Sequence, residues 1–274
     1  MRDFLLERLP DAAPVEEMLQ AGEFVDKAGH PWVGDEPYRP HTFVWFHREL
    51  APEPAVPFDI EVLAADERVV VVDKPHFLAT TPRGTHVTES VLVRLRESLG
   101  LPELAAAHRL DRLTAGVLVL TRERRYRAAY AGVFQTGDVH KTYEALAPFD
   151  PTLEFPRRIA NRIEKRRGSL QAEVVDGEPN AETLVELLET RGDYGRYRLT
   201  PTTGKTHQLR LQLATLGLPI VGDPLYPAIL DVAADDFSTP LQLVARRLVF
   251  TDPLDQAPRE YTSRFPLEWP AAAR

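Results

Sequence analysis

The arrangement of apolar and polar residues predicts a mixture of strands and helices from residue 58 onward. Residues 59–64 and 68–73 are rich in β-branched and apolar side chains, and the polar turn Ala65-Asp66-Glu67 between them predicts a hairpin. Apolar runs predict further strands over these ranges: 117–121, 140–147, 182–189, 194–200 and 241–250. Because these elements do not follow a strict β-α-β order, we expect an α+β fold with a largely antiparallel sheet flanked by helices and loops.

Three segments carry helical periodicity together with start and stop signals. The first helix is predicted to begin after a cap at Thr88 or Ser90 and to end at residue 99. The second covers 122–135, and the third begins at Thr206 and continues to residue 216. Each of the three is followed by a glycine, which favours the end of a helix.

Residues 1–57 differ in composition from the remainder of the chain. They contain 8 of the 24 prolines and carry 11 acidic residues against 5 basic ones. The proline-rich run 51–57 predicts a stiff linker, and short apolar alternations within 22–50, such as residues 42–46, predict a few strands. We therefore expect an N-terminal extension over 1–57, either a small module or an embellishment, and one larger domain over 58–274.

Composition excludes several classes of protein. The 274 residues include no cysteine, which excludes disulfide scaffolds, cysteine-ligated zinc, iron–sulfur clusters and a thiol nucleophile. There is no stretch of 18 apolar residues, and acids interrupt the N-terminus where a secretion signal carries an apolar core. We therefore expect a cytoplasmic protein with no membrane segment. The eight histidines form no i, i+4 pair, so no metal site is predicted.

Charge is distributed unevenly along the chain. The net charge is −8, yet residues 108–127, 157–167 and 191–210 together hold 17 Lys and Arg against 4 Asp and Glu. These three basic islands are either solvated faces or parts of one basic surface that binds a polyanion.

The densest cluster of polar residues is the predicted loop His108-Arg-Leu-Asp-Arg-Leu-Thr-Ala-Gly116. Asp111 lies there between Arg109 and Arg112, and a neighbouring guanidinium keeps a carboxylate ionised. An oriented carboxylate acts as a nucleophile or stabilises a cationic sugar centre. The alternative is a surface ion pair on a turn.

A second cluster covers residues 203–210. Its Gly-Lys-Thr resembles the end of a phosphate-binding loop, but Leu199 stands where that motif needs a glycine, so we reject a nucleotide triphosphatase. Lys205 and the free N–H groups of a helix N-terminus are suited to phosphate, and His207 and Arg210 share one face. An ordinary amphipathic helix is the alternative. A third cluster, Lys141-Thr-Tyr143 in a strand, is uninformative alone.

In order and spacing, these segments resemble the RluA-type family of RNA pseudouridine synthases. The resemblance covers about 58–250 and is carried by Val72-Asp-Lys-Pro75, His108-Arg-Leu-Asp111 with Thr114 and Gly116, Lys141-Thr-Tyr143, Ala181-Glu-Thr183, Gly204-Lys-Thr-His-Gln-Leu-Arg210 and Gly217-Leu-Pro-Ile-Val-Gly-Asp-Pro-Leu-Tyr226. It implies a pseudouridine synthase catalytic domain that isomerises specific uridines in rRNA or tRNA without a cofactor or metal. It also implies that the N-terminal extension is a degenerate form of a small RNA-binding module. We expect a monomer whose partner is RNA.

The resemblance also implies roles for individual residues. Asp111 matches the catalytic aspartate, Tyr143 the tyrosine that stacks on the target base, and Arg210 the arginine that pairs with the aspartate. Arg109 matches an arginine that holds the site of the extrahelical nucleotide. Lys205 and His207 we expect to contact the RNA.

Breaking the bond between uracil and C1′ builds positive charge on the ribose, which a fixed carboxylate stabilises. Asp111 either attacks C1′ or assists the formation of a glycal, and both remain open here. Two other classes also remain: an RNA-binding or assembly protein without chemistry, and a glycosidase that excises the base. The glycosidase needs a second carboxylate to activate water, with Glu103 and Glu144 as the nearest candidates in the sequence.

Overall fold

The computed structural model describes residues 1–9, 14–46, 52–84 and 86–270. They form two compact units, Met1–Pro52 and Glu53–Arg274. None of the helices in these ranges has the length and apolar character that are needed to cross a bilayer.

The first unit contains two short helices that the sequence analysis did not predict, α1 (Arg2–Arg8) and α2 (Val15–Gln20). The prediction of strands within 22–50 is wrong over residues 22–46, and residues 47–50 lie outside the described ranges. In the described part of this unit, pairing is limited to isolated bridges of Val25 with Trp45 and with Pro31. Pro31 has no N–H group to continue a ladder, so the pairing does not extend there. The small core consists of Met1, Leu5, Val15, Met18, Leu19 and Phe24.

Residues 53–57 of the predicted linker belong to the second unit, whereas Pro52 belongs to the first and Ala51 lies outside the described residues. The Glu53 carboxylate accepts hydrogen bonds from the backbone N–H groups of residues 87–89. Val56 is buried in the main core. The second unit therefore begins at Glu53, five residues before the predicted boundary.

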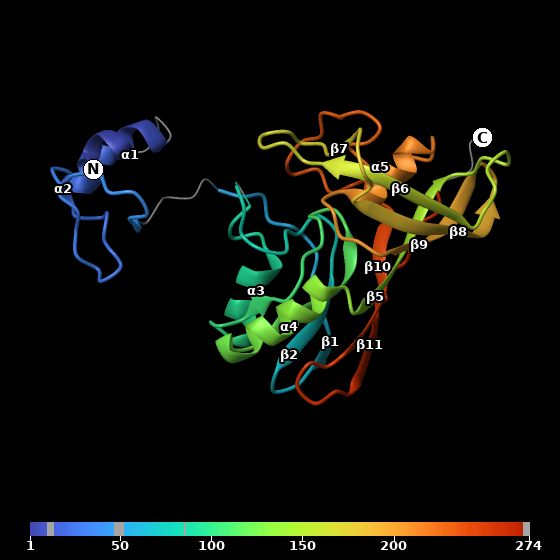
Figure 1. Ribbon diagram of the computed structural model, residues 1–274, viewed down its shortest axis with the longest axis horizontal. Coiled ribbons are helices and arrows are strands. Elements are labelled where there is room, and N and C mark those ends of the chain that lie inside the picture. The colour runs from blue at the N-terminus through green and yellow to red at the C-terminus, as the bar shows by residue number, and fades with distance from the viewer. Residues whose placement is uncertain (10–13, 47–51, 85, 271–274) are drawn as a thin grey trace. The chain divides into compact units, whose positions relative to one another are not determined.

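The second unit is built on an eleven-stranded sheet with three helices (Figure 1). The strands are β1 (Glu61–Ala65), β2 (Val69–Lys74), β3 (Ala105–Ala106), β4 (Ala115–Thr121), β5 (Val139–Pro148), β6 (Arg157–Glu164), β7 (Glu173–Val175), β8 (Ala181–Arg191), β9 (Tyr194–Pro201), β10 (Leu243–Thr251) and β11 (Pro258–Thr262). The helices are α3 (Val91–Leu99), α4 (Arg124–Thr136) and α5 (Gln208–Thr215).

The strand order is β1-β2-β4-β10-β5-β9-β8-β6-β7, with β3 beside β4 and β11 beside β10. Strands β4 and β10 pair in parallel, whereas the other described pairs are antiparallel. This topology confirms the expected α+β fold with a largely antiparallel sheet.

Local signals determine several of these elements. The predicted hairpin around residues 65–67 forms as β1 and β2. The Ser90 hydroxyl accepts a hydrogen bond from the Val93 N–H and so caps α3, which ends at Gly100 in the left-handed region. Helix α4 ends in the same way at Gly137.

Strands β2 and β4 are buried on both faces, which explains their continuous apolar sequences. Val70, Val72, Leu118 and Leu120 face the core that contains α3. The alternate residues Val69, Val71, Val117 and Val119 pack with Tyr130 of α4. The two helices therefore cover opposite faces of these central strands. Helix α5 lies toward the part of the sheet that contains β6 and β8 (Figure 1).

Candidate active site

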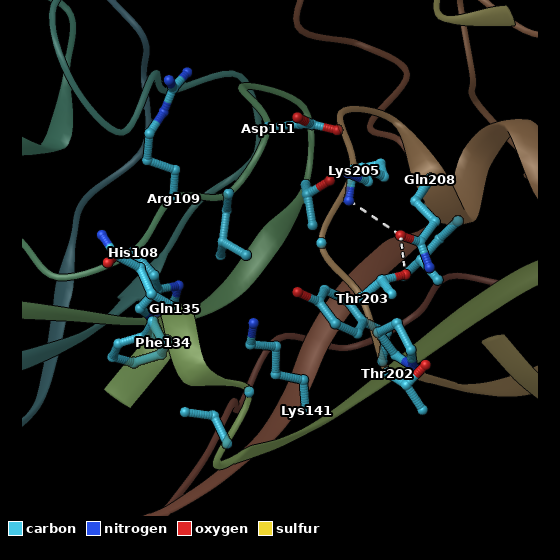
Figure 2. A pocket seen from close by; sticks show the side chains of 18 of the residues that line it. His108, Arg109, Asp111, Phe134, Gln135, Lys141, Thr202, Thr203, Lys205 and Gln208 are labelled. Atoms are coloured by element: carbon cyan, nitrogen blue, oxygen red, sulfur yellow. Dashed lines mark hydrogen bonds between the residues drawn. The ribbon is translucent and has the colours of Figure 1, made fainter. Parts of the chain in front are cut away.

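A cavity of about 930 Å³ opens between three segments of the second unit (Figure 2). These are the loop 106–111, residues 131–141 at the end of α4 and the start of β5, and residues 200–210. All six residues that the sequence analysis selected line it: Arg109, Asp111, Tyr143, Lys205, His207 and Arg210. Among the described lining residues, Asp111 is the only acid. Across the described ranges, no three His, Cys, Asp or Glu side chains gather as a metal site would require.

The loop that carries Asp111 is anchored on both sides by the segment that follows β2. The Thr80 hydroxyl donates to the Leu110 carbonyl at 2.8 Å and accepts from the Leu110 N–H at 3.1 Å. His76 Nδ1 lies 2.8 Å from the Leu113 carbonyl, so this nitrogen carries the proton. Burial lowers the pKa of His76 to about 4, so its ring is neutral at pH 7.

Lys74 at the end of β2 adds a third anchor. Its fully buried ammonium donates to the carbonyls of Pro75, Leu78 and Arg112, at 2.8, 2.8 and 3.1 Å. Burial lowers the pKa of Lys74 to about 7, and the negative charge of Asp111 opposes this shift. Lys74 thus holds the carbonyl of Arg112, the residue that follows Asp111.

Gly116 is required where this loop becomes β4. Its φ is +119°, and a Cβ atom there would lie 2.4 Å from the carbonyl oxygen of Ala245 in β10. Only glycine permits both this backbone conformation and the close approach of the two parallel strands.

Arg210 projects from α5 toward Asp111 and is itself only 2% exposed. Its Nη1 lies 3.9 Å from Asp111 Oδ2, whereas its two short hydrogen bonds go to Asp223, at 2.7 and 2.6 Å. Burial lowers the pKa of Arg210, but the hydrogen bonds and charge of Asp223 outweigh it, so the pKa is raised. The guanidinium is therefore a permanent cation, aligned by Asp223 and facing a half-buried Asp111.

Asp223 is positioned by a tight turn. Its Oδ1 also accepts hydrogen bonds from the N–H groups of Leu225 and Tyr226, at 2.8 and 3.2 Å. The preceding Gly222 has a φ of +76°, and a Cβ atom there would lie 2.4 Å from the Pro240 carbonyl oxygen. The turn thus holds the carboxylate of Asp223 in place, and this carboxylate in turn aligns the Arg210 guanidinium.

Tyr143 lies on β5 and forms part of the cavity wall. Burial raises the pKa of its phenol, and the nearby charge of Asp111 raises it further. The side chain therefore stays protonated and neutral at physiological pH, and it offers an aromatic surface beside the carboxylate.

The segment before α5 differs from the prediction. The helix begins at Gln208 rather than at Thr206, because His207 adopts a left-handed conformation with φ of 57°. The Gln208 side chain stabilises this turn: its Oε1 accepts from the Lys205 N–H at 3.0 Å and from the Thr203 hydroxyl at 2.8 Å (Figure 2). The Lys205 N–H is thus occupied, and its exposed side chain remains the group available to a phosphate.

His207 is linked to Tyr226 rather than to the solvent. Its Nδ1 lies 3.0 Å from the Tyr226 hydroxyl, which also bonds to the backbone N–H and carbonyl of Ala172. Burial lowers the pKa of His207, although the charge of Asp111 acts in the opposite direction. The ring is therefore neutral at pH 7.

The two arginines that flank Asp111 in the sequence do not hold its carboxylate. Arg112 donates to the Phe77 carbonyl at 3.3 Å, and Arg109 is exposed and points away from Asp111 (Figure 2). The cation that faces Asp111 comes instead from α5. We expected the adjacent arginines to hold the carboxylate of Asp111, and this expectation is wrong. The turn at Asp111 separates their side chains from the carboxylate.

Sequence reasoning missed Asp223 and Gln208 as parts of the site. Asp223 lies in Gly217-Leu-Pro-Ile-Val-Gly-Asp-Pro-Leu-Tyr226, which contributed to the resemblance, and it is the only acid there. That isolated acid was the available signal. Gln208 lies in Gly204-Lys-Thr-His-Gln-Leu-Arg210, which also contributed to the resemblance, but nothing in that segment indicates that its side chain bonds to Thr203 and Lys205.

The comparisons with known proteins agree with this geometry. Residues 68–215 match the family model described as RNA pseudouridylate synthase. Dual-specificity RNA pseudouridine synthase RluA of Vibrio parahaemolyticus is 30% identical over 213 residues, which cover 70% of this chain and 78% of that protein. An uncharacterized RNA pseudouridine synthase of Chloroflexus aurantiacus is 34% identical over 243 residues, 81% of this chain and 73% of the relative.

Solved structures give the same result. The structure of human RNA Pseudouridylate Synthase Domain Containing 1 matches with a TM-score of 0.60 and 25% identity, covering 78% of this chain and 87% of that one. The chain therefore belongs to the RluA-type RNA pseudouridine synthase family, isomerases that convert uridine in RNA to pseudouridine.

Proposed function

We propose that Asp111 is the catalytic carboxylate of this pseudouridine synthase and that Arg210 aims it at the ribose. The observation that carries the proposal is the arrangement of one acid, one buried cation and one aromatic ring around a single cavity. A carboxylate held beside a fixed cation is suited to the positive charge that develops at C1′ when the glycosidic bond breaks.

Tyr143 supplies the stacking surface for the uracil base in this proposal. A uridine must leave its helix before an enzyme reaches C1′ and C5, and an aromatic ring compensates for the lost stacking. Because its pKa is raised, Tyr143 acts as a neutral surface and not as a phenolate base.

The remaining selected residues bind the RNA around the target. Arg109 and Lys205 are exposed at the cavity and contact phosphates, while the neutral His207 presents a ring to the nucleotide. One relative is named a ribosomal large subunit pseudouridine synthase and others are named dual-specificity RNA pseudouridine synthases, and on that basis we propose rRNA or tRNA as the substrate. We extend the proposal to a cytoplasmic monomer, and to the N-terminal unit as an additional RNA contact.

Excision of the base is less well supported than isomerisation. Excision needs a second carboxylate, and neither of the two candidates lines the cavity. Glu144 pairs with Arg246 at 3.2 Å, and Glu103 accepts a hydrogen bond from the Arg124 N–H. Nucleoside analysis of reacted RNA distinguishes the two reactions. Isomerisation yields pseudouridine of unchanged mass, whereas excision yields free uracil.

The test of the catalytic assignment is Asp111→Asn, measured as pseudouridine formed in a single turnover. We expect loss of nearly all activity, with RNA affinity and thermal stability close to those of the wild type. The matched control is Asp235→Asn, an exposed acid that does not line the cavity, and we expect it to retain full activity. Wild-type turnover by Asp111→Asn would refute the assignment.

A further inference from the structure

Lys141 is a further cation in the lining of the cavity, besides Arg109, Lys205 and Arg210, and lies on the same strand as Tyr143. Because side chains two residues apart point to the same face of a strand, both project from β5 into the cavity. Figure 2 shows the Lys141 side chain directed into the open space between Phe134 and Thr203. The proposed function has no role for it.

The ammonium of Lys141 has no anionic partner in the described part of the chain. No hydrogen bond or ion pair to it is found there, and the nearest interaction is with the Phe134 ring, 5.7 Å from Nζ to the centroid. A cation over an aromatic face is oriented without using its hydrogen-bond donors. The three N–H groups of Lys141 therefore remain available to a ligand.

The aromatic support beneath Lys141 is itself stacked on a second ring and is uncharged. Phe134 stacks on His108 with 4.2 Å between ring centroids. His108 Nε2 in turn accepts the Val119 N–H at 3.1 Å. Burial lowers the pKa of His108 to about 3, so the ring stays neutral at pH 7. No positive charge on His108 therefore competes with Lys141 for an anion.

Lys141 is also separated from the reacting carboxylate. Figure 2 shows the two side chains on different sides of the cavity, with Asp111 on the loop 106–111 and Lys141 beside Phe134. Lys141 therefore lies away from the reacting carboxylate, in a part of the same cavity that is open to a nucleotide next to the target uridine.

We propose that Lys141, oriented by Phe134, binds the backbone phosphate of a nucleotide adjacent to the flipped uridine. This rests on the proposed function, because it takes the base to lie on Tyr143. A partly buried, unpartnered ammonium pairs strongly with a phosphate, and a covalently fixed phosphate near the target sets the depth at which the uridine enters.

The experiment compares Lys141→Met and Lys141→Arg with the wild type, using an RNA stem-loop that the wild type isomerises. For Lys141→Met we expect about tenfold weaker binding at low salt, the loss of one charge-assisted contact. The slope of log affinity against log salt should fall by about 0.7, the value for one phosphate in single-stranded RNA. Lys141→Arg should restore most of the affinity and the slope.

A double-mutant cycle identifies the phosphate. Single neutral methylphosphonate linkages replace, one at a time, the phosphates that flank the target uridine. For the RNA that is neutral at one of these positions, wild type and Lys141→Met should bind with equal affinity, because that RNA no longer has the phosphate charge that Lys141 contacts. If the losses of binding free energy caused by Lys141→Met and by the neutral linkage are additive at every flanking position, the proposal is overturned. So would a slower single turnover by Lys141→Met with unchanged affinity and salt slope, since that result places Lys141 on the reacting base.

The control is Arg264→Met, which also removes one positive charge. Arg264 is 68% exposed, pairs with Glu61 and does not line the cavity. We expect its affinity and salt slope to match the wild type. The binding measurements on Lys141 are independent of the catalytic assignment. An active Asp111→Asn would refute that assignment, and the salt slope and the linkage cycle would still test the phosphate contact.

Discussion

The ion pair between Arg210 and Asp223 gives the sharpest stability prediction. In Asp223→Asn the carboxylate charge is lost, but Oδ1 still accepts from the N–H groups of Leu225 and Tyr226. The substitution therefore leaves the turn intact and removes the charge that neutralises a guanidinium only 2% exposed. Stability changes then report on the ion pair itself.

The magnitude follows from the burial of both partners. Removing one partner of a buried pair costs about 3–5 kcal/mol. Asp111 lies 3.9 Å from Nη1 and still neutralises part of the buried positive charge. We therefore expect a loss of stability at the lower end of this range, about 3 kcal/mol. With a urea dependence of about 2 kcal/mol per molar, the unfolding midpoint falls by roughly 1.5 M. Single-turnover isomerisation should slow as well, because Arg210 loses its alignment.

The matched control is Asp236→Asn at an exposed Asp that bonds only to Ser238. It should change the free energy of unfolding by less than about 0.5 kcal/mol. Urea unfolding of the three proteins is followed by circular dichroism. A loss below about 1 kcal/mol in Asp223→Asn, with unchanged isomerisation, would show that Asp223 does not hold Arg210 as the geometry requires.

Three further predictions concern other parts of the site. Gly116→Ala should lower the free energy of unfolding in urea by about 3 kcal/mol, because the new Cβ would meet the backbone of β10. The control Gly132→Ala lies in α4 with no atom within 4 Å of the new Cβ, and it should stabilise the protein slightly. Equal effects of the two substitutions would contradict this prediction. Because burial lowers the pKa of His76 to about 4, only the unfolded chain binds a proton there between pH 6.5 and 4, so stability falls with falling pH by about 1.4 kcal/mol per unit. His76→Asn should remove that part of the slope, and an unchanged pH dependence of urea unfolding would refute it. Tyr143→Leu should weaken RNA binding by about tenfold through lost stacking, whereas Tyr143→Phe should bind like the wild type; equal loss in both variants would contradict the stacking role.

Much of the catalytic unit could be predicted because local signals and burial agree there. Ser90 and Gly100 mark both ends of α3, and the apolar runs at 68–73 and 117–121 are the strands that are buried on both faces. These patterns are short-range and need no tertiary information.

The parts that could not be predicted depend on tertiary contacts. Strand β6 is rich in arginine and only half buried, so it shows no clear apolar alternation. Helices α1 and α2 have 7 and 6 residues, too short for a periodic signal. The pairing of Arg210 with Asp223 is likewise invisible in the sequence, because the two residues are 13 positions apart and two glycines with positive φ, Gly217 and Gly222, lie between them.

The most direct test of the central claim is the structure of Asp111→Asn bound to an RNA that the wild type isomerises. The account predicts a uridine turned out of its helix, with its base against the Tyr143 ring and C1′ of its ribose in van der Waals contact with the side chain at position 111. A uridine bound elsewhere, or a ribose turned away from that position, would contradict it.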